Sequence, residues 1–164
     1  MERTLIENLK SETGNEVVIN AWVDVARNQG KMAFFDFRDR SGVVQGVVFG
    51  KPEVLEVAKT LRPEWVVTVT GKVNKRPENM VNEKIQNGDI ELEVTNIDIL
   101  NRAHELPFDM DAELNIDTYL DYLPLTLRTK KHQAVFTVQA EIIKAFRAFL
   151  SSEDFVEFQA PKLV

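Results

Sequence analysis

The sequence predicts a mainly β protein whose first hundred residues form a five-stranded barrel, with one helix between the third and fourth strands. Three observations predict it. Residues 15–102 are rich in Val, Ile and Phe, and apolar and polar positions alternate with the period of a strand. Five such runs are separated by turn residues, among them Gly30 and Gly42. One stretch, KPEVLEVAKTL, has helical spacing instead.

The strands are expected at residues 16–25, 32–39, 43–49, 65–74 and 90–100. Before the fourth strand, Pro52 suits the first turn of a helix, and Val54, Leu55, Ala58 and Leu61 form its apolar stripe. Three strands, a helix and two strands is the element order of the OB-fold, a barrel that often binds oligonucleotides. Other small β-barrels share this order.

Residues 101–164 have a different pattern. A polar, irregular linker is expected at 101–125, a long helix at 130–149 and a strand at 155–158, before Pro161. The helix keeps one apolar stripe, formed by Ala134, Val138, Ile142, Phe146 and Phe149. One helix and one strand cannot bury such a face, so this stretch either opens a larger domain or binds a partner. The expected organisation is a barrel domain at 1–102, a hinge at 103–128 and a second domain that starts at 129–164.

The composition excludes several classes of protein. The 164 residues include no Cys, which excludes a disulfide scaffold, a Cys-ligated zinc site and a thiol nucleophile. His104 and His132 have no second His or nucleophile at a useful spacing, so no metal site is expected. No apolar run reaches the roughly 18 residues of a membrane span, and the N-terminus lacks a signal-peptide pattern, so a cytoplasmic protein is expected.

The outer face of the second and third strands carries the residues best suited to bind single-stranded nucleic acid. Side chains alternate across a strand, so residues 33, 35 and 37 form an apolar inner face and Phe34 faces solvent. If 39–42 form a four-residue loop, Asp36 lies opposite Gln45, which then shares the outer face with Phe34. An exposed aromatic ring can stack on a base, and an amide can donate to and accept from a base edge. The alternatives are that Phe34 caps a barrel end or packs under a loop, and that Gln45 is simply solvated.

The net charge of −6 argues against a protein that binds nucleic acid through bulk attraction to phosphate. Its distribution weakens this objection. Residues 1–102 carry 14 Lys and Arg against 16 Asp and Glu, so most of the negative excess lies in 103–164. Two segments, 27–40 and 72–84, are each locally +2 and fall at strand ends or hairpin loops. Each segment is also compatible with an ordinary solvated loop.

Three runs of sequence, in order along the chain, resemble the class IIb aminoacyl-tRNA synthetases, the aspartyl, asparaginyl and lysyl group. The run RNQGKMAFFDFRDRSGVVQGVVF is similar to their anticodon-binding OB domain. The run RPENMVNEKIQNGDIE resembles the loop before the fifth strand in the bacterial aspartyl members. The third run, LPLTLRTKKHQAVFTVQAEIIKAFRAFLSSEDFVEFQAPKL, resembles the link into the catalytic domain followed by class II motif 1, in which Pro161 closes the motif.

The resemblance implies roles for individual residues in tRNA anticodon recognition. Phe34 matches the aromatic residue that stacks on the central anticodon base, a uridine, and Gln45 matches the glutamine that hydrogen-bonds to the same base. Arg27 matches the hairpin arginine that approaches the anticodon stem-loop, and Glu91 the glutamate that helps to read the first anticodon base. The remaining candidates, in the loop near the anticodon, are Arg76 and Asn82.

The chain also departs from the family pattern. Asp24, Val25 and Ala26 stand where bacterial relatives carry basic residues, and Asn74 stands where a second arginine is common, which predicts weaker anticodon affinity. Motif 1 commonly has Thr before its Pro, and here the residue is Ala160.

The family attaches an amino acid to tRNA with ATP and Mg²⁺, and uses motif 1 to form a homodimer. Nothing in residues 1–164 resembles motifs 2 and 3, which hold ATP, so these residues are expected to be an N-terminal fragment that binds tRNA without catalysis and without a cofactor. Three alternatives remain: an asparaginyl, lysyl or non-discriminating aspartyl member, a stand-alone OB module for single-stranded nucleic acid, and an interaction module that dimerises through 133–158.

Overall fold

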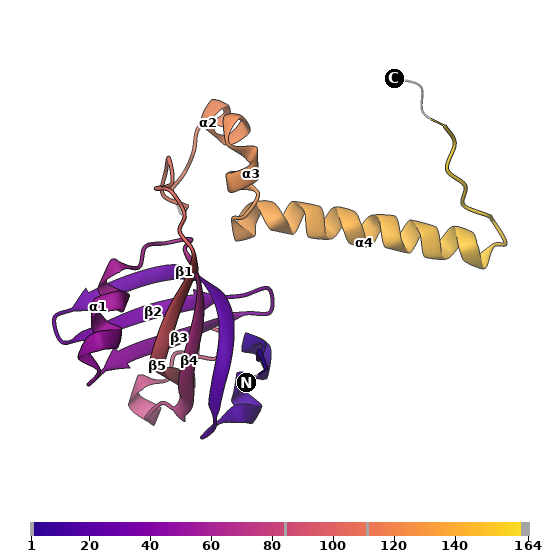
Figure 1. The fold of residues 1–164 in the computed structure, drawn as a ribbon. Coiled ribbons are helices and arrows are strands. Elements are labelled where there is room, and N and C mark those ends of the chain that lie inside the picture. The colour runs from indigo at the N-terminus through magenta and orange to yellow at the C-terminus, as the bar shows by residue number, and fades with distance from the viewer. Residues whose placement is uncertain (1, 84, 111, 162–164) are drawn as a thin grey trace. The chain divides into compact units, whose positions relative to one another are not determined.

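The computed structural model describes residues 2–83, 85–110 and 112–161 (Figure 1). The chain divides into two compact units, Met1–Glu105 and Leu106–Val164.

The first unit is a closed five-stranded barrel. Its strands are β1 (Glu16–Gln29), β2 (Met32–Arg38), β3 (Val43–Phe49), β4 (Val66–Lys75) and β5 (Ile90–Asn101). They follow one another in the order β1-β2-β3-β5-β4, with β4 paired back to β1 (Figure 1). All neighbours are antiparallel except β3 and β5, which pair in parallel around Gly46 and Leu92. The prediction of five strands and of the OB element order is confirmed.

Strand β1 continues four residues beyond its predicted end, because the first hairpin is very tight. Gln29 pairs directly with Met32, which leaves a two-residue turn. Gly30 occupies this turn with a φ of +64°, in the left-handed region that residues with a side chain rarely adopt.

The predicted helix before the fourth strand is α1 (Pro52–Thr60), and it packs against β2, β3 and β5. A second helical segment, the 3₁₀ helix η1 (Ile6–Glu12), was not predicted. It contacts β1, β3 and β4, and both Ile6 and Leu9 are fully buried. Two apolar residues three positions apart are too short a pattern to indicate a helix, since only burial in the barrel stabilises one so short.

Alternate residues of the strands fill the barrel, so each strand has one buried face. Phe35 and Phe37 of β2 are fully buried and stack with ring centroids 5.5 Å apart. The other strand residues of the core cluster are Val17, Ile19, Ala21, Val23, Ala33, Val44, Val48, Val67, Val69, Val73, Ile90, Leu92, Val94 and Ile97. The alternation leaves the outer face of β2 and β3 available for function.

The second unit contains α2 (Ile116–Asp121), α3 (Leu123–Thr126) and α4 (Lys130–Ser152). The expectation of an irregular linker is therefore wrong for 116–125. The side chain of Asn115 caps α2 by accepting a hydrogen bond of 2.8 Å from the backbone amide of Thr118, a cap that stabilises even a short helix. The predicted long helix is confirmed as α4, which ends three residues later than expected.

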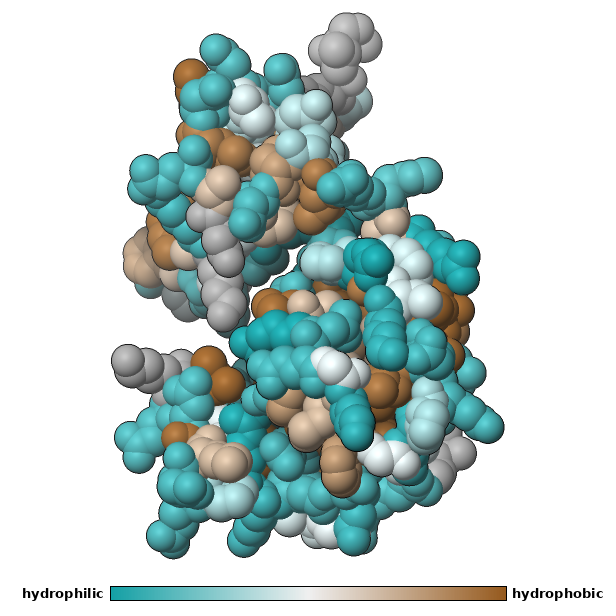
Figure 2. All heavy atoms as spheres, turned by 90° about the vertical axis from the view of Figure 1, so that its left-hand side faces the viewer, coloured by the Kyte–Doolittle hydropathy of each residue, from teal (hydrophilic) through white to brown (hydrophobic). Residues whose placement is uncertain are grey.

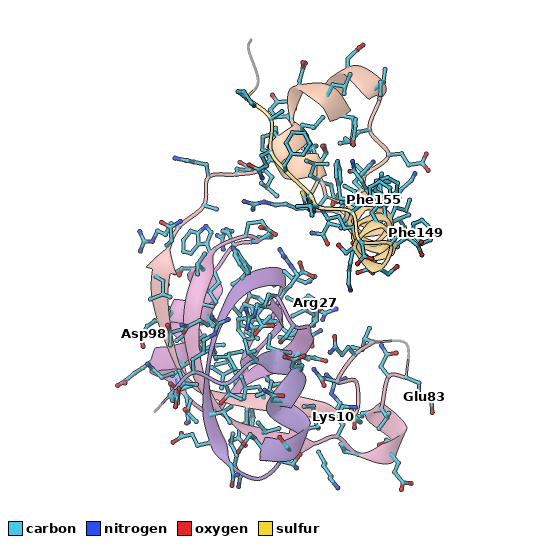
Figure 3. All side chains as sticks on the ribbon, turned by 90° about the vertical axis from the view of Figure 1, so that its right-hand side faces the viewer. Lys10, Arg27, Glu83, Asp98, Phe149 and Phe155 are labelled. Carbon is cyan, nitrogen blue, oxygen red and sulfur yellow. The ribbon has the colours of Figure 1, made fainter. Side chains whose placement is uncertain are left out.

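The predicted strand at 155–158 is wrong, because residues 155–161 form neither helix nor strand. A strand needs a neighbour for its backbone hydrogen bonds, and here the amide of Phe155 instead donates to the carbonyl oxygen of Leu150, over 3.0 Å. Figure 3 shows Phe149 and Phe155 together at this end of α4. The apolar stripe of α4 stays exposed, at Val138, Ile142, Phe146 and Phe149.

Among the described residues, no helix is long and apolar enough to cross a membrane.

Candidate nucleic-acid interface

The outer face of β2 and β3 has the register that the sequence predicts. The loop between the strands spans four residues, from Asp39 to Gly42, so Asp36 pairs with Gln45 and Arg38 with Val43. Phe34 pairs with Val47, two positions further along, and is half-buried, as is Gln45. Phe34 and Gln45 are therefore diagonal neighbours on one face of the sheet.

Arg27 lies beside Phe34 on the neighbouring strand, since the two residues are paired between β1 and β2. Its Nη2 donates to both carboxylate oxygens of Asp36, over 3.1 and 3.0 Å. Burial raises the pKa of Asp36, and Asp24 raises it further, although Arg27 and Arg76 act in the opposite direction. The side chain of Arg27 is half-exposed and pairs across the strands with Phe34, which suits it to a phosphate contact beside that ring.

Gln45, Arg76 and Glu91 form a connected group. Arg76 follows β4, and its Nη2 donates a hydrogen bond to Oε1 of Gln45, while its Nε lies 3.7 Å from Oε2 of Glu91. Its side chain is only 7% exposed, and Nε is buried without a hydrogen-bond acceptor among the described residues. Because β3 and β5 run parallel, Gln45 and Glu91 lie on adjacent strands at the same end of the barrel.

This group fixes what Gln45 can offer to a base. A guanidinium can only donate, so it must face the amide oxygen of Gln45. The amide nitrogen then remains as the group available to a ligand. The oxygen of the predicted donating and accepting amide thus already accepts one hydrogen bond, from Arg76, and keeps a second lone pair.

Arg38 does not contribute free positive charge to this face. Its Nε donates to Oδ1 of Asp24 over 2.9 Å, its Nη2 donates to Oε1 of Glu64 over 2.6 Å, and the guanidinium lies 5.5 Å from the centre of the Trp22 ring. Within the basic segment at 27–40, Arg27 and Arg38 are thus paired with carboxylates, whereas Lys31 and Arg40 are exposed. Of the other predicted basic segment, Lys84 lies outside the described residues.

The predicted loop before β5 folds back on itself. It contains the 3₁₀ helix η2 (Glu78–Met80) and the exposed Asn82, whose backbone amide donates to the carbonyl oxygen of Gly88 over 3.1 Å. A Cβ on Gly88 would lie 1.9 Å from the carbonyl oxygen of Asn82, so this turn requires glycine. Figure 3 places Glu83 of this loop and Arg27 on one side of the barrel, with Asp98 on the other.

Two residues that the sequence did not single out hold this end of the barrel together. Asn87 is buried, and its side-chain amide donates to the carbonyl oxygens of Ile6 and Val43, over 3.3 and 3.2 Å. Asp39 is the second, with a fully buried carboxylate at the β2–β3 loop. The segment DRSG, an acid followed by turn residues, is the only sequence signal for Asp39.

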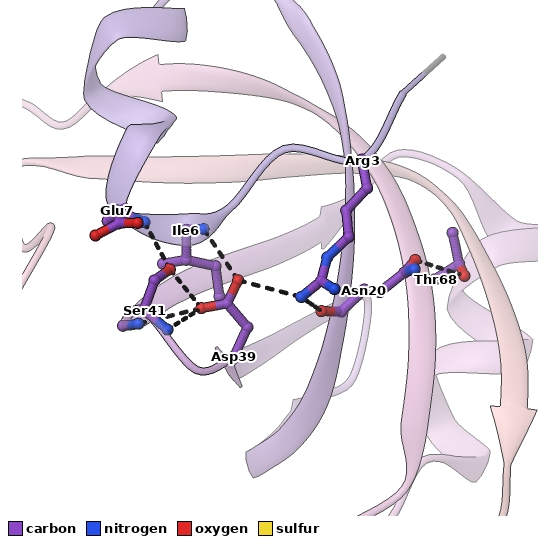
Figure 4. Close-up of polar contacts among 8 residues, drawn as sticks. Arg3, Ile6, Glu7, Asn20, Asp39, Ser41 and Thr68 are labelled. Carbon is purple, nitrogen blue, oxygen red and sulfur yellow. Dashed lines mark hydrogen bonds and ion pairs between the residues drawn. The ribbon is translucent and has the colours of Figure 1, made fainter.

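The Asp39 carboxylate accepts four hydrogen bonds (Figure 4). The donors are the hydroxyl of Ser41, at 2.6 Å, and the backbone amides of Ser41, Gly42 and Ile6, at 2.7, 3.1 and 3.1 Å. Burial alone would raise the pKa of Asp39, but the hydrogen bonds from Ser41, Ile6 and Gly42 hold it below its usual value. Asp39 therefore ties η1 to the loop that sets the register of the outer face.

The structure brings together five of the predicted site residues: Arg27, Phe34, Gln45, Arg76 and Glu91. Asn82 lies exposed in the adjacent loop. Pro161 belongs to the other unit and is exposed. No group of three or more His, Cys, Asp or Glu side chains in the described part of the chain could hold a metal ion. The surface that Figure 2 shows is mostly hydrophilic, with apolar side chains scattered between the polar ones.

Comparison with known proteins matches both units to known families. Residues 17–100 match the family of OB-fold nucleic acid binding domains, and residues 115–164 match the class II tRNA synthetases of the D, K and N group. The chain is 41% identical to an aspartate–tRNA(Asp/Asn) ligase of Dictyoglomus turgidum and 38% identical to an aspartate–tRNA ligase of Staphylococcus aureus. Each alignment covers 92% of this chain but 26% of the relative, so the chain spans about a quarter of their length.

Solved structures agree with these matches. An aspartyl-tRNA synthetase from Entamoeba histolytica superposes with a TM-score of 0.88 at 26% identity, over 99% of this chain and 40% of that one. Asparaginyl-tRNA synthetase from Pyrococcus horikoshii, complexed with asparaginyl-adenylate, gives 0.82 at 28% identity, over 98% of this chain and 37% of that one. The closed barrel and these matches show that the chain belongs to the family of OB-fold nucleic acid binding domains and is homologous to aspartyl-tRNA synthetases.

Proposed function

We propose that this chain is the anticodon-recognising N-terminal part of an aspartate–tRNA ligase. The observation that carries the proposal is the position of Phe34 on the outer face of an OB barrel, between Arg27 and Gln45. The identity of 41% to an aspartate–tRNA(Asp/Asn) ligase supports it. The ligand is the anticodon stem-loop of tRNA(Asp).

Each side chain has a distinct part in this function. The Phe34 ring stacks on the central anticodon base, an interaction worth roughly 1–3 kcal/mol. The amide nitrogen of Gln45 donates to the edge of that base, while Arg76 holds its oxygen. Arg27 contacts the phosphate backbone, Glu91 accepts from the first anticodon base, and Asn82 contacts the loop nucleotides.

A titration with fluorescent RNA hairpins tests the proposal. The hairpins carry the tRNA(Asp) anticodon loop, with uridine or another base at its centre. Phe34→Ala is expected to weaken binding about tenfold or more, whereas Leu100→Ala, at an exposed apolar residue near the end of β5, leaves it unchanged. Equal binding of all loops and of unrelated oligonucleotides would instead identify a general single-stranded nucleic-acid module. An unchanged affinity in Phe34→Ala across the salt range would refute the stacking.

Recognition of tRNA(Asn) as well is the second candidate. The Dictyoglomus turgidum relative, at 41% identity, is an aspartate–tRNA(Asp/Asn) ligase, whereas the Staphylococcus aureus relative is an aspartate–tRNA ligase. The two anticodons share the central uridine and differ at the third base, so Phe34 and Gln45 do not separate them. Hairpins that differ only at the third anticodon base distinguish the two possibilities. Comparable affinity for both would favour dual recognition.

We assign the exposed stripe of α4 to a homodimer of the parent enzyme, with Pro161 at the end of the dimer motif. Val138, Ile142, Phe146 and Phe149 are exposed on one helix face, a pattern that usually marks an interface. Light scattering is expected to show a dimer that depends on concentration and is lost on deletion of residues 126–164. A concentration-independent monomer would contradict the assignment.

ATP, Mg²⁺ and the acceptor end of tRNA are assigned to the part of the relatives that this chain does not span. Residues 1–164 alone are therefore expected to give no aspartate-dependent exchange of pyrophosphate into ATP. Exchange above background by the purified chain would refute this assignment.

A further inference from the structure

A second aromatic residue lies on the same outer face as Phe34. Phe49 ends β3 and pairs with Met32, while Phe34 pairs with Val47. Residues 47 and 49 of one strand and 32 and 34 of the other thus share one face of the sheet. Phe49 is the diagonal neighbour of Phe34, a relation in which the two Cα atoms are about 7–8 Å apart.

These side chains differ in how far they are exposed to solvent, and Phe49 is the most exposed of them. Val47 is only 8% exposed and Phe34 is half-buried, whereas Phe49 is 62% exposed. Phe49 belongs neither to the described core nor to the partly buried side chains that pack against it. Phe49 thus offers an exposed ring on the same face as Phe34, and the barrel core does not use it.

We propose that Phe49 is a second stacking platform, which binds the nucleotide next to the base on Phe34. This inference rests on the proposed function and extends it by one nucleotide. The two rings stand on adjacent strands, at diagonal positions whose Cα atoms are about 7–8 Å apart. Bases stacked on them therefore lie side by side and not on each other, as unstacked bases do in single-stranded loops bound by proteins. Every base has a π face, so Phe49 adds affinity without sequence preference.

The chemistry distinguishes Phe49 from its neighbours. Gln45 reads the edge of a base, and its loss changes the preference among bases. Loss of the Phe49 ring is expected to weaken the binding of all RNA loops by a similar factor, about tenfold. Phe49→Trp replaces the ring with a larger aromatic one and is expected to keep or raise the affinity for RNA.

The test uses the full 164-residue chain and anticodon hairpins with the fluorescent base 2-aminopurine, placed in turn at the two positions that flank the central uridine. In the unmodified chain, binding changes the fluorescence at one flanking position through stacking on Phe49. Phe49→Ala is expected to remove that change and to weaken binding about tenfold. Leu100→Ala, at an exposed apolar residue of β5, serves as the matched control and leaves both unchanged. Circular dichroism melts check that each variant is folded.

Two outcomes overturn the inference, and they differ in what they say of the proposed function. If Phe49→Ala binds within twofold of the unmodified chain and keeps the fluorescence change, while Phe34→Ala binds weakly, only the second platform is refuted. If neither variant loses affinity, the proposed stacking on Phe34 fails as well.

Discussion

The guanidinium of Arg76 donates a hydrogen bond to the amide oxygen of Gln45 from a position almost wholly shielded from water. Two of the predicted site residues therefore act as one unit. Arg76 fixes the orientation of the amide, and the amide presents its nitrogen to the outer face. A donor selects bases that offer a carbonyl oxygen, such as O4 of uracil, over bases that offer an amino group at the same place.

Arg76→Met is expected to reduce the preference for uracil over cytosine at the central position. Without the guanidinium, the Gln45 amide can rotate and present either atom, so the ratio of the two affinities falls roughly tenfold. The loss of positive charge weakens the binding of both RNAs by the same factor, so it cancels in the ratio of their affinities. Parallel titrations of hairpins with uracil or cytosine at the central position measure this ratio. Lys75→Met, at the exposed neighbouring residue, is the control. An unchanged ratio would show that Arg76 does not orient the amide.

Arg27→Ala is expected to weaken RNA binding for every loop sequence and to flatten its salt dependence. One phosphate contact accounts for a slope of about 0.7–0.9 in a plot of log affinity against log salt concentration. Binding isotherms between low and moderate salt give the slope. Lys59→Ala, on α1, removes the same charge elsewhere and is the control. Equal slopes in all three proteins would exclude a phosphate contact by Arg27.

Asp39→Asn is expected to destabilise the barrel by about 2–4 kcal/mol at pH 7, because an amide cannot replace a buried carboxylate that accepts four hydrogen bonds. The pKa of Asp39 is lowered in the folded protein. Its stabilisation is thus fully present above the unfolded value of about 3.9 and is lost as the pH falls through the folded value.

Urea unfolding at a series of pH values checks this expectation, since the gap between the two proteins should narrow below about pH 4. Asp89→Asn is the control. Its carboxylate also has a lowered pKa, mainly through a hydrogen bond from Lys10 at 2.8 Å, but it lies exposed where such pairs contribute little. A gap that stays constant down to pH 2 would contradict the role assigned to the Asp39 charge.

Asn87→Ala is expected to loosen the loop that carries Asn82, although Asn87 itself is not assigned a contact with RNA. It removes the two hydrogen bonds that the buried amide donates to the carbonyl oxygens of Ile6 and Val43, at a cost of about 2 kcal/mol. Hydrogen exchange of the amides in 77–89 should accelerate, and RNA affinity should fall. Gln86→Ala removes one exposed bond to the carbonyl oxygen of Ser41 and is the milder control. Unchanged exchange in Asn87→Ala would show that the loop is held by other contacts.

The sequence predicts the barrel well because each strand has one buried face, and a period of two is visible residue by residue. The same parity places Phe34 and Gln45 correctly, since the four-residue loop settles the register. The sequence does not predict that Arg76 occupies the Gln45 oxygen, or that Arg38 is neutralised by Asp24 and Glu64. These are contacts between residues far apart in the chain, and no local pattern encodes them.

The errors in the second unit have a related cause. The run at 155–158 has strand composition, but the described residues of the second unit include no strand with which it could pair. The short helices α2 and α3 are set by the Asn115 cap and by Pro124 in the first turn of α3, signals that are weak beside the polar composition of the segment.

The burial of η1 bears on how the chain folds as it leaves the ribosome. Ile6 and Leu9 emerge among the first residues, yet the amide of Asn87 that binds Ile6 and the strand β5 that closes the barrel are made much later. A nascent chain shorter than this keeps its apolar N-terminal segment uncovered, open to chaperones and proteases. Folding of the first unit is thus expected to begin only after β5 has emerged, in one late step rather than strand by strand.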